Sequence, residues 1–463
     1  MTDTRQRNIA LLVAGTFFME NLDGTILTTA APSIGKSLGV PSVAVGVTIT
    51  AYLLTLAVLI PLSGWITRRF GSRRVFLVAI AVFTIASILC AVSTSLTELT
   101  IMRVLQGIGG AMMVPVGRLA VLRVTDRSDL VRAIALLTWP ALVAPVIAPL
   151  AGGLITTYAT WHWIFLINVP LGMIAFIAAL RLIPMEPLET PPRLDWIGLL
   201  LTCSGLGALV YLGSLFSEGS FGVLEIVVWA VGGFGMVGLA IAHQLRTRHP
   251  LLDLRALRIE TFRLSHAGGS LFRLSVSAVP FLLPLLFQDV FGWSPVFSGA
   301  IVLFVFIGNI AIKPATTPLL RSFGFRTVII GATTAAALSM ALMSFIAAST
   351  PWWLVILLLT FSGIARSVGF TAYNTIAFAD VKRVEMTDAN TLASTLQQVA
   401  AGFGVAVGAI ALRAGDLIVG GNGAGSFQLA FAVLAVLTAA ATVEALRMTA
   451  TGGENIRPVR QSA

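Results

Sequence analysis

Two carboxylates stand close together in the first long apolar stretch of the chain, where acidic side chains are rare. Glu20 and Asp23 are three residues apart, which in a helix places both on one face. Two like charges in a medium of low dielectric constant repel each other, so one of them readily holds a proton near neutral pH. The pair therefore suits a site that binds and releases protons. The alternative interpretation is that one of them only forms a structural pair with a basic residue.

A second charged position, Arg103, lies in another apolar stretch, with Gln106 on the same face of the expected helix. A guanidinium group that is always charged can tune a neighbouring acid and organise water around it. The alternative is a purely structural contact, either with a backbone carbonyl or with Asp23.

Three further basic residues, Arg273, Lys313 and Arg366, fall within apolar stretches of the second half of the chain. A charge near the middle of a bilayer costs about 3 kcal/mol or more, so such residues usually face a cavity or a partner. With Arg103 they outnumber the two acids, which predicts a positively biased cavity suited to an anionic substrate or a metal chelate. The alternative is that some of the four pair with carbonyls or loop acids, or that Lys313 snorkels to the interface. The candidates for the substrate cavity are Arg273, Arg366, Lys313, Gln106 and Asn374.

The composition indicates which elements must position these groups. Of 463 residues, 57% are hydrophobic and 11% are charged, whereas soluble domains carry about 25% charged residues. Lipid must therefore surround much of the chain, and at roughly 20 apolar residues per span its length allows about fourteen transmembrane helices. We predict an all-α, polytopic membrane protein without a sizeable soluble domain. The net charge of +10 does not indicate nucleic-acid binding, because the basic residues are spread over short loops.

The basic residues are distributed unevenly between alternate loops. With the N-terminus inside, most of the 30 lysines and arginines fall in loops on the inner side, and the outer loops hold only Lys36 and Arg413. Inner loops of membrane proteins are enriched in basic residues. We therefore predict a multi-pass protein of the cell inner membrane with both termini in the cytoplasm.

A short repeat divides the expected helices into two halves. The pattern R-x-F-G-x-R occurs at residues 68–73 and again at 321–326, 253 residues apart and each at the inner end of an expected span. Two six-helix halves separated by two inserted helices give this offset, and such halves bind substrate at their interface. The predicted domains are a six-helix bundle at 1–185, two inserted helices with a cytoplasmic amphipathic linker at 186–260, and a second six-helix bundle at 261–463.

Several longer motifs carry a resemblance to a known family. They are GWITRRFGSRR at 64–74, LDGTI at 22–26 followed by AP at 31–32, R-x-x-QG-x-GG at 103–110, P-x-x-AP-x-x-GG at 145–153 and WHWIF-x-IN-x-P at 161–170. Over most of its length the chain resembles the major facilitator superfamily, in its fourteen-helix drug:proton antiporter branch (the EmrB/QacA type). Two positions depart from the family pattern, since Arg68 stands where aspartate is usual and Ala148 where glycine is usual.

The resemblance implies the major facilitator fold, and it implies a role in proton translocation for Arg103 beside the two carboxylates Asp23 and Glu20. It also implies that a set of small, proline and basic residues acts in gating or as hinges. These positions are Gly64, Gly71, Arg73, Pro145, Pro149, Gly152 and Gly153. For the glycines and prolines the alternative is helix packing alone.

The function that these features favour is proton-coupled export of small molecules, drugs or toxic compounds, by alternating access. The sequence contains no Walker motif, catalytic triad, metal cluster or cofactor fingerprint, so we expect no enzyme activity, cofactor or metal. The alternatives are an exporter of an organic anion, metabolite or metal chelate, and a membrane sensor that transports nothing. The expected partners are a small-molecule substrate, protons and the lipid bilayer, with no nucleic acid, and the chain is expected to act as a monomer.

Overall fold

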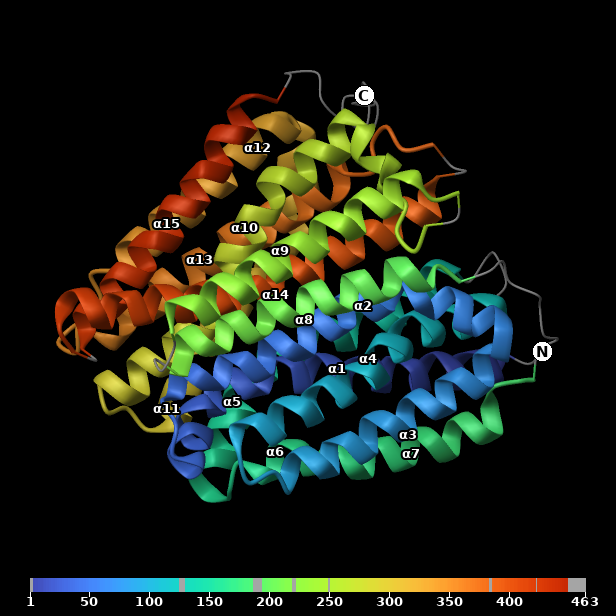
Figure 1. Cartoon of the computed structure of the whole chain (residues 1–463), viewed down its shortest axis with the longest axis horizontal. Coiled ribbons are helices and arrows are strands. Elements are labelled where there is room, and N and C mark those ends of the chain that lie inside the picture. The colour runs from blue at the N-terminus through green and yellow to red at the C-terminus, as the bar shows by residue number, and fades with distance from the viewer. Residues whose placement is uncertain are drawn as a thin grey trace. The chain divides into compact units, whose positions relative to one another are not determined.

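The computed structural model describes residues 3–124, 130–185, 194–218, 222–248, 250–382, 385–421 and 423–448, and every regular element among them is a helix (Figure 1). The first nine α-helices are α1 Asp3–Leu38, α2 Gly46–Phe70, α3 Ser72–Ala91, α4 Leu96–Val124, α5 Leu130–Tyr158, α6 His162–Leu166, α7 Asn168–Leu182, α8 Trp196–Glu218 and α9 Val223–Arg246. The remaining six are α10 Glu260–Leu285, α11 Pro295–Ala311, α12 Lys313–Met343, α13 Trp352–Ile376, α14 Met386–Val419 and α15 Ala424–Leu446.

The helices are long and apolar enough to cross a bilayer. Within the described ranges, twelve of them meet this condition by length and composition, and two shorter apolar helices cover Val143–Tyr158 and Pro295–Ala311. Lipid offers no hydrogen bonds to a backbone, so a spanning segment must satisfy its own amide and carbonyl groups within a helix. The predicted all-α, polytopic fold is confirmed.

The chain divides into two compact units. Unit 1 comprises Met1–Leu251 and Ser294–Gly299, and unit 2 comprises Leu252–Trp293 and Ala300–Ala463. Within unit 1, α1 packs on α5, and α3 packs on α4 and α7. Within unit 2, α10 packs on α14, and α12 packs on α13 and α15. The two units thus use the same pairing of helices in chain order.

The two R-x-F-G-x-R segments make the same local structure in their own units. Gly71 joins α2 to α3 with φ +83°, and Gly324 bends α12 with φ +76°. The last arginine of each segment then reaches the C-terminal end of a later helix of the same unit, α7 in unit 1 and α15 in unit 2. Arg73 donates from Nη2 to the Leu180 carbonyl at 2.6 Å, and Arg326 donates from Nη2 to the Leu446 carbonyl at 2.9 Å.

A glycine at the second of these bends is required by its backbone conformation. At φ +76° and ψ 163°, Gly324 lies in a region that is essentially closed to other residues. We expect Gly324→Ala to lower the free energy of unfolding by about 1–3 kcal/mol, measured as a lower thermal unfolding temperature in detergent.

Gly331→Ala is the matched control on the same helix. A Cβ at Gly331 meets nothing within 4 Å, and alanine favours a helix over glycine by about 1 kcal/mol. The control is therefore expected to be neutral or slightly stabilising. Equal destabilisation by the two substitutions would contradict the assignment of strain to Gly324.

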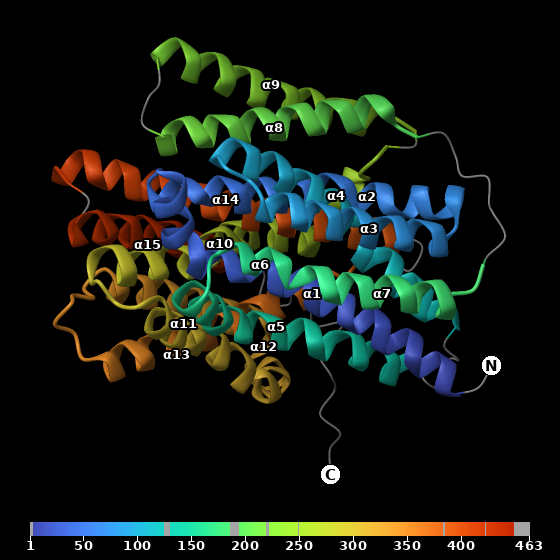
Figure 2. The same cartoon turned by 90° about the horizontal axis from the view of Figure 1, so that it is seen from below.

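Helices α8 and α9 lie side by side as a pair (Figure 2). Asp195, directly before α8, accepts hydrogen bonds from the Gly198 amide at 2.9 Å, from His243 of α9 at 2.8 Å and from the Leu251 amide at 3.2 Å. Burial works to raise the pKa of Asp195, but these donors outweigh it and lower the pKa below its usual value. One carboxylate therefore ties the start of α8, the end of α9 and the following loop together. The predicted boundary at residue 186 falls on 186–193, outside the described residues.

Candidate functional site

A buried ion pair between α1 and α4 is the centre of the candidate site in unit 1. Arg103 donates from Nη1 to Asp23 Oδ2 at 2.5 Å, and both side chains have an exposed fraction of 0%. Paired charges avoid most of the penalty that an isolated buried charge incurs. The sequence named both residues as candidates, and pairing with Asp23 was the structural alternative considered for Arg103.

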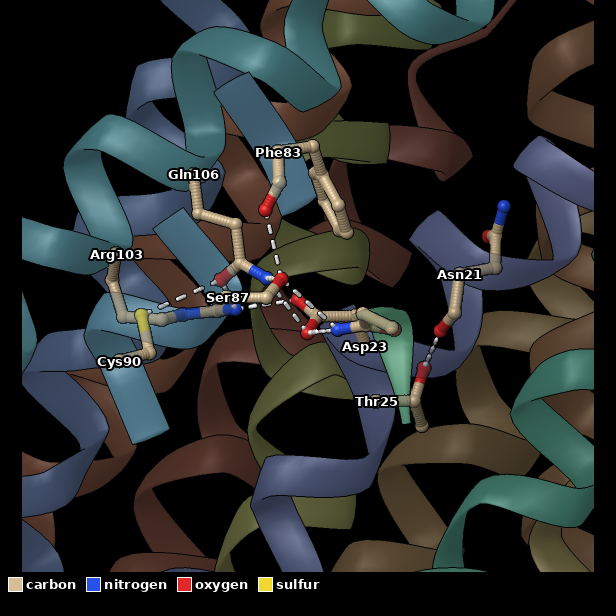
Figure 3. Close-up of polar contacts among 9 residues, drawn as sticks. Asn21, Asp23, Thr25, Phe83, Ser87, Cys90, Arg103 and Gln106 are labelled. Carbon is tan, nitrogen blue, oxygen red and sulfur yellow. Dashed lines mark hydrogen bonds and ion pairs between the residues drawn. The ribbon is translucent and has the colours of Figure 1, made fainter. Parts of the chain in front are cut away.

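Two amide side chains complete the hydrogen bonding of Asp23, and Figure 3 shows one of them, Gln106, beside the carboxylate. Gln106 of α4 donates from Nε2 to Asp23 Oδ1 at 3.0 Å, and Asn168 of α7 donates from Nδ2 to the same oxygen at 2.7 Å. Gln106 Oε1 in turn accepts from Arg103 Nη1 at 2.6 Å, and Ser87 of α3 accepts from Gln106 Nε2 at 2.8 Å. All three groups that contact the Asp23 carboxylate are hydrogen-bond donors.

Aromatic rings cover the guanidinium group of Arg103. Its Cζ lies 4.0 Å from the centre of the Tyr52 ring and 5.9 Å from that of Phe165, and a cation over such a ring is attracted by its quadrupole. Arg103 Nε and Nη2 are buried without a hydrogen-bond partner in the described structure. Arg103 is therefore held almost entirely through Nη1, its contact with Asp23 and Gln106.

Glycines of the α4 motif let the helix that carries Arg103 approach its neighbours closely. A Cβ at Gly107 would meet Thr55 and the Tyr52 carbonyl of α2, and a Cβ at Gly109 would meet the Ala79 carbonyl and the Phe83 amide of α3. Small residues at such contacts are typical of packed transmembrane helices. These glycines set the depth at which Arg103 and Gln106 enter the site.

Glu20 lies beside this network and takes no part in the ion pair. It is partly exposed, and its Oε2 accepts a hydrogen bond from Asn21 Nδ2 at 3.1 Å. The charged and titratable groups that act on it are Asp23, Tyr52 and Arg103. The two predicted proton-binding carboxylates are thus brought together, one locked in an ion pair and the other more open.

The gating and hinge candidates are distributed over unit 1. A Cβ at Gly152 of α5 would meet the Ile26 carbonyl and Thr29 of α1, and one at Gly153 would meet the Pro295 backbone, so both lie at close contacts. Pro145 and Pro149 lie inside α5. Gly64 has open space around it. Gly71 and Arg73 form the bend and the Leu180 contact described above.

The substrate-cavity candidates of the second half meet in unit 2. Arg273 of α10 donates from Nη2 to Asn374 Oδ1 of α13 at 2.7 Å. Lys313 at the start of α12 donates from Nζ to Thr371 Oγ1 at 3.2 Å, and Arg366 of α13 donates to the Val276 carbonyl of α10 at 3.5 Å. The fifth candidate, Gln106, belongs to the Asp23 network in unit 1.

Sequence reasoning did not select three members of the Asp23 network, namely Ser87, Asn168 and Tyr52. Asn168 belongs to the segment of the α6–α7 motif that carries the family resemblance, so a signal for it existed. Ser87 and Tyr52 are uncharged residues of apolar helices that also hold other hydroxyl side chains, and only the packing of α2 and α3 against α4 reveals their place.

Comparisons with known proteins agree with this architecture. The family model described as Major Facilitator Superfamily matches residues 13–245 and 266–461. The protein called MdtD of Cronobacter sakazakii, whose name proposes a role in multidrug resistance, is 36% identical over 87% of this chain and 85% of its own length.

Solved transporter structures have the same fold at low sequence identity. A POT family transporter in complex with 5-aminolevulinic acid has a TM-score of 0.71 at 14% identity, with 97% of this chain and 96% of that chain covered. A D-xylose–proton symporter has a TM-score of 0.66 at 13% identity, with 93% and 96% covered. At these identities the likeness extends to the fold alone.

Proposed function

Because the chain belongs to the Major Facilitator Superfamily and is a membrane transporter, not an enzyme, we propose that it is a proton-coupled antiporter. It exports small drug-like molecules across the cell inner membrane by alternating access, as a monomer with both termini in the cytoplasm. The observation that carries the proposal is the Asp23–Arg103 ion pair, which is fully buried within apolar helices. The multidrug role comes from the name of the MdtD relative.

A proton can act on this pair as a switch. In the ionised state, Asp23 holds Arg103, Gln106 and Asn168 through its two oxygens. When Asp23 takes up a proton, its charge is lost and the attraction to Arg103 falls, so the guanidinium must find other acceptors. Release of the proton restores the pair. Two arrangements of one buried network provide the bistable element that alternating access requires.

Glu20 supports this proposal as the accessible acid beside the switch. It is more exposed than Asp23 and has no ion-pair partner among the described residues. We assign proton coupling to Asp23, with Glu20 as the group through which protons reach it and Arg103 as the group that senses them. The two halves at 1–185 and 261–463 are the bodies that move against each other and expose the site alternately to each side of the membrane.

The proposal is tested with purified protein in liposomes under an imposed pH gradient. Rhodamine 123 and carboxyfluorescein share a xanthene ring system and differ in charge, so together they report transport of either charge class. We expect one or both to accumulate only while the gradient exists. A membrane sensor would accumulate neither dye, and a facilitator without coupling would equilibrate them with or without the gradient.

Glu20→Gln is expected to slow proton-driven dye accumulation while leaving some coupling in place, because Asp23 remains able to take up protons. The rate should fall more at low proton concentration than at high, measured as initial dye flux over a series of pH gradients. Asn21→Ala is the neighbouring control, because it removes the Asn21–Glu20 hydrogen bond and keeps the carboxylate. Unchanged flux in Glu20→Gln would remove Glu20 from the proton route.

A further inference from the structure

Two guanidinium groups share one aromatic ring in the middle of unit 2. The Cζ of Arg273 lies 5.9 Å from the centre of the Phe370 ring, and the Cζ of Arg366 lies 5.5 Å from the same centre. Arg273 stands about 20 Å along α10 and Arg366 about 21 Å along α13 at 1.5 Å per residue. Both therefore lie near mid-span, where a charge is most costly.

Among the residues that the structure describes, this cluster of Arg273 and Arg366 has no acidic partner. None of the ion pairs between described residues includes Arg273, Arg366 or Lys313. The acid that comes near is Glu444 of α15, which lies beside Gly268 of α10 and acts on Tyr373, without an ion pair to either arginine. Like charges repel across a ring, so their placement without a counterion is unfavourable unless something else supplies negative charge.

The hydrogen-bonding capacity of the two arginines is largely unused. A guanidinium has five N–H donors, yet within the described part of the chain the single bond of ordinary length is the one from Arg273 to Asn374 at 2.7 Å. The bonds from Arg273 to the Ser265 carbonyl and from Arg366 to the Val276 carbonyl are both 3.5 Å long. The Val276 carbonyl is open because Pro280, four residues on, has no N–H to donate to it.

Buried polar atoms without partners occur on the two arginines and on neighbouring residues of α13. Arg273 has an exposed fraction of 2%, and its Nε is unpartnered, as is the Nε of Arg366. The hydroxyls of Ser367 and Tyr373, with exposed fractions of 0% and 1%, are also unpartnered within the described structure. Buried donors left unsatisfied cost about 1–3 kcal/mol each, so the two Nε atoms and the Tyr373 hydroxyl beside Arg273 point to a bound acceptor.

The sequence repeat gives this cluster a counterpart. Counting on from Glu20 by the 253 residues that separate the two R-x-F-G-x-R segments arrives at Arg273. Equivalent positions on α1 and α10 thus carry opposite charges. The first helix of unit 1 carries acids at this level, and the first helix of unit 2 carries Arg273, which forms no ion pair with an acid in the described ranges.

We infer that Arg273 and Arg366 bind the oxyanion of an aromatic organic acid, a carboxylate or sulfonate. Guanidinium groups bind such oxyanions through paired, charge-assisted hydrogen bonds, and Phe370 offers a face for the aromatic body. The inference rests on the proposed transport function and names the class of substrate that unit 2 of the transporter binds. It departs from a preference for cationic drugs.

The test measures binding, so that it does not depend on proton coupling. Full-length protein in nanodiscs of zwitterionic lipid is titrated with carboxyfluorescein, and separately with rhodamine 123, by fluorescence anisotropy. We expect carboxyfluorescein to bind more tightly than rhodamine 123. Arg273→Gln and Arg366→Gln should each raise the Kd of carboxyfluorescein by about tenfold or more. Arg273→Lys keeps the charge and should raise this Kd less.

Thermal unfolding separates a binding role from a structural one. An arginine without a counterion costs stability, so Arg366→Gln should leave the unliganded protein as stable as the parent or more so. Carboxyfluorescein should raise the unfolding temperature of the parent protein and not that of the variant. A large drop in unliganded stability for both glutamine variants, with anionic dye binding unchanged per folded molecule, would falsify the inference.

A lipid headgroup carries the same oxyanion chemistry and is distinguished by a second titration. Nanodiscs that contain phosphatidylglycerol should leave carboxyfluorescein affinity unchanged if the site takes a substrate. Competition by that lipid, lost in Arg273→Gln, would assign the site to a headgroup and overturn the substrate assignment. The substrate assignment would also be overturned if rhodamine 123 bound more tightly than carboxyfluorescein, or if carboxyfluorescein did not bind. Gradient-driven transport of rhodamine 123 in that case would leave the proposed antiport intact.

Discussion

Asparagine at position 23 is expected to abolish proton-driven dye accumulation and to lower the free energy of unfolding by about 3–5 kcal/mol. The substitution removes the charge that holds Arg103 and leaves that guanidinium buried with an exposed fraction of 0%. Its Nε and Nη2 have no hydrogen-bond partner to fall back on among the described residues. Dye flux in liposomes measures the first effect, and thermal unfolding in detergent measures the second.

The double variant Asp23→Asn with Arg103→Gln separates coupling from stability. Two neutral amides of similar size can hydrogen-bond to each other and to Gln106 and Asn168, so most of the lost stability should return. Proton-driven accumulation should remain absent, because no titratable group is left at position 23. Gradient-driven transport in either the single or the double variant would mean that the proton is carried elsewhere, with Glu20 the next candidate.

Alanine at Gly109 is expected to be the most damaging small substitution in α4. A Cβ there would meet the Phe83 amide at 2.7 Å and the Ala79 carbonyl at 2.8 Å, so backbone and not a flexible side chain must move. Overpacking of this kind costs about 1–3 kcal/mol. Because the shift displaces the helix that carries Arg103, dye flux should fall along with the unfolding temperature.

Gly15→Ala in α1 is the matched control for this prediction. It adds the same methyl group to a helical glycine whose Cβ position has nothing within 4 Å. Flux and stability should stay at the parent level or rise slightly, since alanine favours a helix over glycine by about 1 kcal/mol. If Gly109→Ala behaves like this control, close approach of α3 and α4 is not what positions Arg103.

The helices were predictable because their signal is local. Apolar runs of membrane-spanning length must form helices, and the R-x-F-G-x-R repeat already marked equivalent ends of two spans. The same sequence could name Asp23 and Arg103, since a charge in an apolar run is conspicuous. It could not establish that they meet, because contacts across helices 80 positions apart depend on how each helix is rotated about its axis.

Uncharged partners were the part of the site that sequence could not supply. Ser87 lies in α3 among many small residues, and its role follows only from its contact with Gln106. In the sequence Tyr52 is an ordinary aromatic residue of an apolar helix, and its role follows only from the contact of its ring with Arg103. In unit 2, Arg273 and Asn374 were both candidates from the sequence. Their hydrogen bond joins α10 to α13, and the sequence pattern of neither helix shows that the two are in contact.

The absence of a counterion at Arg273 and Arg366, described above for the residues that the structure covers, has an electrical consequence. Inward movement of one proton in exchange for a monovalent cation transfers no net charge. The same proton exchanged for a monovalent anion transfers two charges in one electrical sense, each worth about 2.3 kcal/mol per 100 mV of membrane voltage. An exporter built around these arginines would therefore draw on the voltage as well as on the proton gradient, and its turnover would generate a current.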